Sequence, residues 1–234
     1  MRERSVDLVP VMRRVAVIGG LGMHPIERLS IPARRLLACM ALRRVATTRS
    51  LISGELWPDV PEETARSNLR RALWHVPPGW ISAEGDELIL EAETDLNDAA
   101  QAAQRALAGE TLTLAEITLL SADVLPGWHE EWVLPHQRAF HLLRVQALEA
   151  VCRTMSRLGC HALAIQAGSA ALSAEPLRES AAEALIEAHL GQRNRFEAVQ
   201  CFRDLAQRLH DELGVEPDAG LSERVATLGC ATVH

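Results

Sequence analysis

The chain has 234 residues, of which 48% are hydrophobic, and its 24 basic residues against 31 acidic ones give a formal net charge of −7. This length allows one large domain or two modest ones, and the hydrophobic content supplies a core for either. No run of about eighteen apolar residues occurs and the first residues lack a secretory signal, so we expect a cytoplasmic protein and exclude a membrane protein.

The five cysteines are scattered along the chain without a Cys-x-x-Cys pair. This spacing excludes a disulfide framework and a zinc knuckle, and it predicts free, buried thiols.

Charge is distributed unevenly along the chain. Residues 1–93 contain 13 arginines and 12 acidic residues, whereas residues 94–234 contain 11 arginines and 19 acidic residues, so their net charges are +1 and −8. Segment 28–54 has six arginines and no acidic residue, and segment 64–83 has three arginines and none. Because salt screens charges beyond about 8 Å, a DNA backbone would respond to these local excesses. The acidic total therefore does not exclude DNA binding.

Short strands are expected near the start of the chain. Arg14–Ile18 is β-branched and bounded by glycines, which predicts a strand, and Leu29–Ile31 is expected to pair as another. The glycines that follow Ile18 lack the Gly-Lys-Ser/Thr ending of a phosphate-binding loop, so they indicate a turn.

Three helices and a hairpin follow these strands. The helices are expected at residues 33–45, 50–57 and 61–75, and the hairpin at residues 80–90. The third helix has an apolar face formed by Ala65, Leu69, Ala72, Leu73 and Val76. Its opposite face carries Ser67, Arg70, Arg71 and Trp74.

This order of elements is typical of a winged helix. An α-helix fits the major groove, arginine pairs with guanine edges, and a hairpin can lie along the minor groove or the backbone. Arginines on an exposed helix are often only solvated, but a third helix directly before a hairpin favours DNA binding. The candidate DNA-binding residues are Arg66, Ser67, Arg70, Arg71, Trp74, Arg49, Arg34, Arg35 and Gly85. Glu62 and Glu63 suit the helix dipole but not a phosphate neighbour, so groove contacts should begin after them.

Trp74 has two possible roles. It could lie against the sugar-phosphate backbone, or it could pack under the hairpin around Trp80 and Leu88. Packing is favoured, because large aromatic side chains rarely stay exposed.

Everything beyond Thr94 is predicted to be helical. The expected helices cover residues 95–108, 115–121, 131–158, 161–174, 176–190, 194–213 and 218–228. Ala164 and Ala198 lie 34 residues apart, which is the period of tetratricopeptide-type helix pairs. The sequence thus predicts a mainly α protein with a winged helix-turn-helix (α+β) domain at 1–93 and an all-α, tetratricopeptide-like helical-repeat domain at 94–234.

No catalytic or metal-binding motif is present. The chain has no His-Glu-x-x-His and no Gly-x-Ser-x-Gly sequence, and His136 and His141 are five residues apart, so they do not share a helix face as a metal pair would. We therefore expect no enzyme activity, no metal and no cofactor.

Several long motifs carry a family resemblance. Glu55–Trp74 (ELWPDVPEETARSNLRRALW) resembles the second and third helices of SARP-type bacterial regulators, which bind DNA with a response-regulator-like winged helix. Leu125–Leu134 (LPGWHEEWVL), Leu148–Ala150, Ala174–Ser180 (AEPLRES) and Glu212–Pro217 (ELGVEP) are similar to the bacterial transcriptional activator domain that follows it.

The resemblance implies that Arg66–Trp74 is the recognition helix of an activator that binds double-stranded promoter DNA and contacts RNA polymerase. Relatives often continue this helix with a basic turn where this chain has Pro77–Pro78. Fewer phosphate contacts should weaken the monomer, so we expect a homodimer formed through the helical domain. The alternative is a protein-interaction module with a reduced winged helix, in which Arg144, Arg153 and Arg157 would line a peptide groove.

Overall fold

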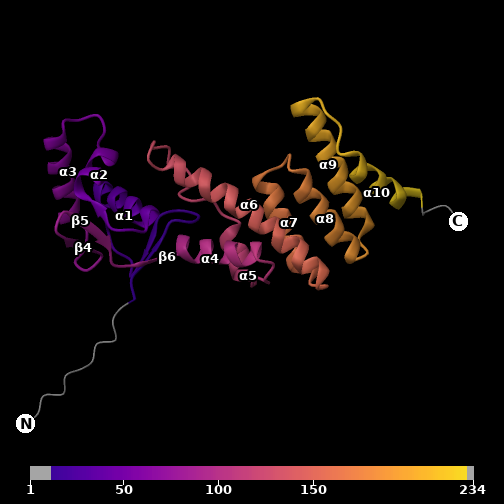
Figure 1. Ribbon diagram of the computed structural model, residues 1–234, viewed down its shortest axis with the longest axis horizontal. Helices are drawn as coiled ribbons and strands as arrows, with labels where there is room; N and C mark the ends of the chain where they lie inside the picture. Colours follow the sequence, from indigo (N-terminus) through magenta and orange to yellow (C-terminus); the bar gives the residue numbers. More distant parts are fainter. Residues whose placement is uncertain (1–11, 231–234) are drawn as a thin grey trace, which may run out of the picture. The chain divides into compact units, whose positions relative to one another are not determined.

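The computed structural model describes residues 12–230 (Figure 1), and by its internal contacts the chain divides into two compact units. Among the described residues, the first unit contains residues 12–98 together with Val124–Gln137, and the second contains Ala99–Asp123 and residues 138–230. The domain boundary after residue 93 stays a prediction. The contacts group the LPGWHEEW motif (residues 125–132) with the first unit, whereas the sequence resemblance places this motif in the helical domain.

A small sheet opens the first unit. Its central strand β1 (Arg14–Ala16) pairs antiparallel with β2 (Gly22–His24) and parallel with β6 (Glu93–Thr94). The carboxylate of Asp95 accepts the backbone N–H groups of Val17 and Ile18 at 2.8 and 3.1 Å, which fixes the chain just beyond β1.

The strand expected at Leu29–Ile31 is wrong. The second strand is β2, and Ile31 is the first residue of helix α1 (Ile31–Arg43). The physical reason is Pro32. Its fixed φ suits the first turn of a helix, and it lacks the backbone N–H that a strand would need.

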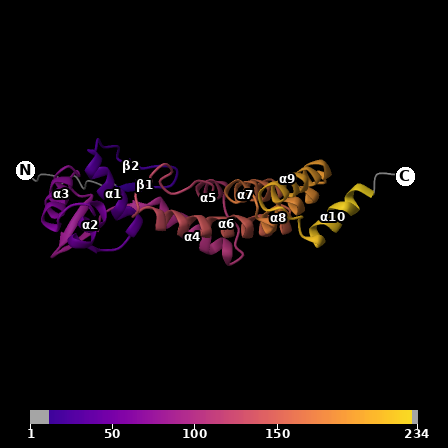
Figure 2. The same ribbon diagram turned by 90° about the horizontal axis from the view of Figure 1, so that it is seen from above.

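The three helices and the hairpin are confirmed within two residues at each end. Helices α2 (Arg49–Leu56) and α3 (Glu62–Trp74) follow α1, and the hairpin consists of β4 (Ile81–Glu84) and β5 (Glu87–Leu90). A short strand β3 (Thr47–Thr48) pairs with the other side of β5, so the sheet order is β3-β5-β4. Figure 2 shows α1, α2 and α3 from a second direction. They share one core, which includes Leu36, Met40, Ile52, Leu56, Leu69 and Leu88.

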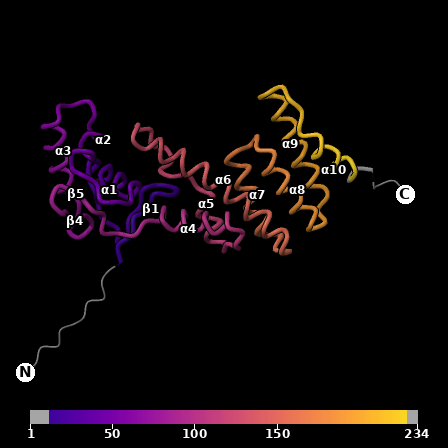
Figure 3. Tube along the Cα trace, viewed as in Figure 1, coloured from indigo at the N-terminus to yellow at the C-terminus, as the bar shows by residue number. Residues whose placement is uncertain are grey.

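The remaining helices belong wholly or partly to the second unit. They are α4 (Asp95–Leu107), α5 (Leu114–Leu120), α6 (Leu134–Arg157), α7 (His161–Ala174), α8 (Glu179–Gly191), α9 (Arg195–Leu213) and α10 (Ala219–Cys230). The trace in Figure 3 follows α7, α8 and α9 side by side, and each packs against the next. Helices α6 and α8 begin three residues later than the sequence predicted.

The helical repeat is confirmed. Helices α7 and α9 begin at His161 and Arg195, 34 positions apart, and the equivalent Ala164 and Ala198 are both fully buried. Close packing requires small residues here: a Cβ at Gly168 would lie 2.9 Å from the sulfur of Cys152.

Among residues 12–230, no helix combines the length and apolar character needed to cross a bilayer.

Candidate nucleic-acid interface

Helix α3 presents two chemically different faces. Ala65, Leu69 and Ala72 are buried against the core of the first unit, as the helical wheel predicted. Arg66, Arg70 and Arg71 are exposed, whereas Ser67 is half-buried. The apolar face therefore fixes the rotation of the helix, and this rotation turns the arginines outward.

The three arginines differ in what they contact. A guanidinium nitrogen of Arg66 lies 2.7 Å from a carboxylate oxygen of Glu62 one turn earlier, and both side chains are largely exposed. Over the described part of the chain, neither Arg70 nor Arg71 has an ion-pair partner. These two cations are consequently available to an external anion, whereas Glu62 partly neutralises Arg66.

Trp74 does not pack under the hairpin, so that interpretation is wrong. The side chain at the end of α3 is 90% exposed, whereas Trp80, which follows the Pro77–Gly79 turn, is 1% exposed. Trp74 is therefore left on the same outward face as the arginines.

The hairpin tip is acidic. Glu84, Asp86 and Glu87 are exposed on either side of Gly85, which adopts a φ of +60° that favours glycine. Gly85 thus serves the turn, and carboxylates on both sides make this tip a poor neighbour for phosphate.

Arg49, at the start of α2, donates its backbone N–H to the carbonyl of Asp86 at 2.9 Å, which ties α2 to the hairpin.

Arg35 has partners within the protein, and its DNA contact stays a prediction. Its Nε lies 2.7 Å from a Glu130 carboxylate oxygen, and its side chain donates to the carbonyl of Leu56 at 2.8 Å. Its guanidinium carbon also lies 6.0 Å from the centre of the Trp57 ring. These contacts hold Arg35 inside the first unit.

Arg34 is exposed, but it lines cavities with the β2–α1 loop and with residues 127–130.

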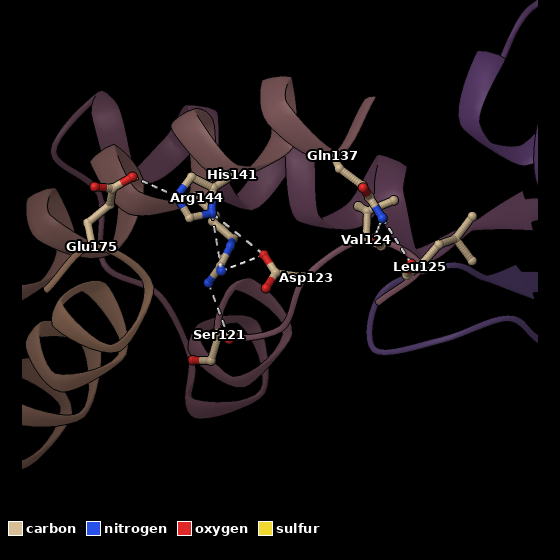
Figure 4. Close-up of polar contacts among 8 residues, drawn as sticks. All are labelled: Ser121, Asp123, Val124, Leu125, Gln137, His141, Arg144 and Glu175. Atoms are coloured by element: carbon tan, nitrogen blue, oxygen red, sulfur yellow. Dashed lines mark hydrogen bonds and ion pairs between the residues drawn. The ribbon is translucent and has the colours of Figure 1, made fainter. Parts of the chain in front are cut away.

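The loop before α6 is fixed by one glutamine. Nε2 of Gln137 donates to the carbonyls of Val124 and Leu125 at 3.1 and 3.0 Å (Figure 4), and to the carbonyl of Trp128 at 3.2 Å. Leu125 has a φ of +42° and donates its N–H to the carbonyl of Val17 at 2.7 Å. The LPGWHEEW segment is therefore part of the first unit, which its chain position did not indicate.

A separate polar cluster lies in the second unit and is also drawn in Figure 4. Arg144, whose side chain is 3% exposed, pairs with Asp123 at 2.5 Å, and Nε2 of His141 lies 2.8 Å from a Glu175 oxygen. Because Arg144 is buried and paired, it cannot line a peptide groove as the alternative interpretation expected. The cluster holds α6 to the segments that precede α6 and α8.

The histidines and cysteines of the described residues do not form a candidate metal site. No group of three or more His, Cys, Asp or Glu side chains could hold a metal ion there. Burial raises the pKa of the Cys39 and Cys152 thiols to about 12 and lowers the pKa of His136. The expectation of buried cysteines holds for these two and is wrong for Cys160, which is exposed; the Cys230 side chain lies outside the described residues.

Comparisons with known proteins agree with the two-part fold. Residues 83–228 match the family described as "Bacterial transcriptional activator domain". A solved structure titled "Mycobacterium tuberculosis EmbR in complex with low affinity phosphopeptide" superposes with a TM-score of 0.64, covering 95% of this chain and 66% of that one at 22% identity. At this identity the likeness supports the fold alone, and it confirms the winged helix followed by a helical domain.

Two curated relatives are similar over most of the chain. "Regulatory protein AfsR" of Streptomyces coelicolor is 32% identical over 212 residues, which cover 81% of this chain and 21% of the relative. The protein of the same name from Streptomyces griseus is 29% identical over 245 aligned residues, which cover 95% of this chain and 25% of the relative. The chain thus spans about a quarter or less of these relatives. The chain belongs to the bacterial transcriptional activator domain family, in agreement with its resemblance to SARP-type regulators.

Proposed function

We propose that this regulator binds double-stranded DNA sequence-specifically through α3 and activates transcription in the cytoplasm by contacting RNA polymerase. The outward face of α3 carries the proposal: Arg70 and Arg71 are exposed and have no ion-pair partner within residues 12–230, on a helix whose opposite face is fixed in the core. Arginine in the major groove can donate two hydrogen bonds to guanine, and each such pair contributes about 1–3 kcal/mol of discrimination. Arg66, Ser67 and Trp74 extend this face, and Arg49 at the start of α2 is a further candidate.

The mobility-shift test uses a DNA sequence selected from a random pool by the purified protein. Arg70→Ala with Arg71→Ala should reduce specific affinity at least about tenfold and lower the salt dependence by roughly one unit for each lost phosphate contact. Arg195→Ala with Arg203→Ala is the matched control, because both arginines are exposed on α9 of the second unit. Full affinity after loss of Arg70 and Arg71 would overturn the proposal.

We keep one second candidate, a protein-interaction module, because the helical unit contains a groove. A cavity of about 530 Å³ is lined by side chains of α7, α8 and α9, among them His189, Glu197 and Asp204. Grooves between such helix pairs can hold peptides. Absence of salt-sensitive retention on heparin and on duplex DNA at low ionic strength would favour this candidate over DNA binding.

A further inference from the structure

The β2–α1 loop and the start of α1 leave two isoleucines in solvent. Ile26 is 89% exposed and Ile31 is 74% exposed. Single exposed apolar side chains are common, but each of these two borders a hollow. A cavity of about 640 Å³ is lined by Ile26, Arg28 and Arg34, and a second of about 320 Å³ is lined by Ile31 and Arg34.

Arg34 lines both cavities, so the isoleucines belong to one continuous surface. We name Ile26, Arg28, Ile31 and Arg34 the Arg34 surface. The walls of the larger cavity are mostly hydrocarbon, contributed by Leu21, Met23, Leu29 and Leu37. A ligand for this surface must therefore bring apolar side chains.

The charges on the Arg34 surface are unmatched. Several other arginines of the first unit have carboxylate partners, such as Arg14 with Asp98, Arg35 with Glu130 and Arg43 with Glu55, although Arg70 and Arg71 on α3 have none in the described residues. Within residues 12–230, neither Arg28 nor Arg34 has such a partner. Two carboxylate residues line the cavities: Glu27, and Glu130, which is already paired with Arg35. A complementary ligand would supply carboxylates around an apolar centre.

Two other occupants fit these observations less well. DNA phosphates would pair with the arginines but would gain nothing from two exposed isoleucines, and no α3 residue lines either cavity. In a symmetric dimer through this surface, a second copy would place its own Arg28 and Arg34 opposite the same residues, which is repulsive.

We propose that the Arg34 surface binds an acidic amphipathic segment of a partner protein, with apolar side chains in the two cavities and carboxylates on Arg28 and Arg34. This goes beyond the proposed DNA binding and does not depend on it, because none of these residues lies on α3. Apolar anchors would supply most of the affinity, and the charge pairs would set orientation and salt dependence.

The test measures fluorescence anisotropy of a labelled helical peptide with leucines along one face and glutamates elsewhere. Ile26→Ser with Ile31→Ser and Arg34→Glu should weaken binding at least tenfold, with unchanged circular dichroism. Phe196→Ser with Arg195→Glu is the matched control, since it removes an exposed apolar side chain and reverses a neighbouring exposed arginine on α9. This control should bind as tightly as the native chain.

A charge swap separates recognition from damage to the fold. Arg34→Glu alone should lose the glutamate peptide and gain the same peptide carrying lysines in place of the glutamates. Equal binding of both peptides by the native chain, or no effect of the triple substitution, would overturn the proposal. The proposal would also fail if the triple substitution left peptide binding intact but abolished retention on DNA, or abolished dimerisation as measured by analytical sedimentation.

Discussion

Trp74 leaves the end of α3 with 90% of its side chain in solvent, although a tryptophan gains much from burial. The next aromatic residue along the chain, Trp80, is buried instead, with 1% of its surface exposed. An exposed indole beside Arg70 and Arg71 can stack on the sugar-phosphate backbone, which is the second role that the sequence left open.

Trp74→Ala tests this role. Since the side chain has few contacts, the free energy of unfolding should change by less than about 0.5 kcal/mol, as for other surface substitutions. DNA affinity should fall severalfold in a mobility-shift assay. A packed tryptophan would instead cost about 3–5 kcal/mol in urea denaturation, and that result would contradict the position described here.

Helices were predictable because their signals are local. The apolar face of α3, Pro32 at the start of α1, and the 34-residue spacing of α7 and α9 are all visible in the printed sequence. Pairing was not predictable for the shortest strands, such as β3 and β6 with two residues each, since a two-residue strand has no periodicity. The contacts of Arg35 were not predictable for a related reason: its partner Glu130 lies 95 positions away in the sequence, and no local pattern indicates it.

The LPGWHEEW segment shows how one side chain can fix an element. Gln137→Leu keeps the size of the side chain but removes the donor to three carbonyl groups. Leaving such acceptors unpaired should reduce the free energy of unfolding by about 1–3 kcal/mol in urea denaturation. Gln101→Leu on the exposed side of α4 is the control and should change it little. An equal effect of both substitutions would mean that Gln137 does not hold the segment.

Acid sensitivity of the second unit should depend on Glu149. This carboxylate accepts hydrogen bonds from Arg178 and Ser180 at 2.6 and 2.9 Å and pairs with Arg153 at 2.5 Å. Burial opposes its ionisation, but these partners outweigh burial and hold the pKa of Glu149 below its usual value. A lowered folded-state pKa stabilises the fold above the unfolded value of about 4.3, and the stabilisation is lost as the pH falls through the folded value.

Glu149→Gln should therefore be less stable than the native chain at pH 7 and should lose less stability on acidification. Urea denaturation at pH 7 and below pH 4 measures the difference, with Glu110→Gln as an exposed control. If both chains lose stability in parallel on acidification, another carboxylate is responsible.

The whole chain combines the short helix α3, which is proposed to recognise DNA, with a net charge of −7. Helix α3 ends at Trp74 and Pro77 prevents its continuation, so a single copy has few arginines to offer. Each phosphate contact contributes to affinity through counterion release, and an acidic helical unit adds none. Two linked copies would double the contacts and convert the second binding step into an intramolecular one.

A duplex with two selected half-sites about 34 Å apart should therefore bind more than tenfold tighter than one half-site. The measurement is a mobility shift across protein concentrations, with half-sites moved by half a helical turn as the control, and equal affinity for one and two sites would show that the chain acts as a monomer.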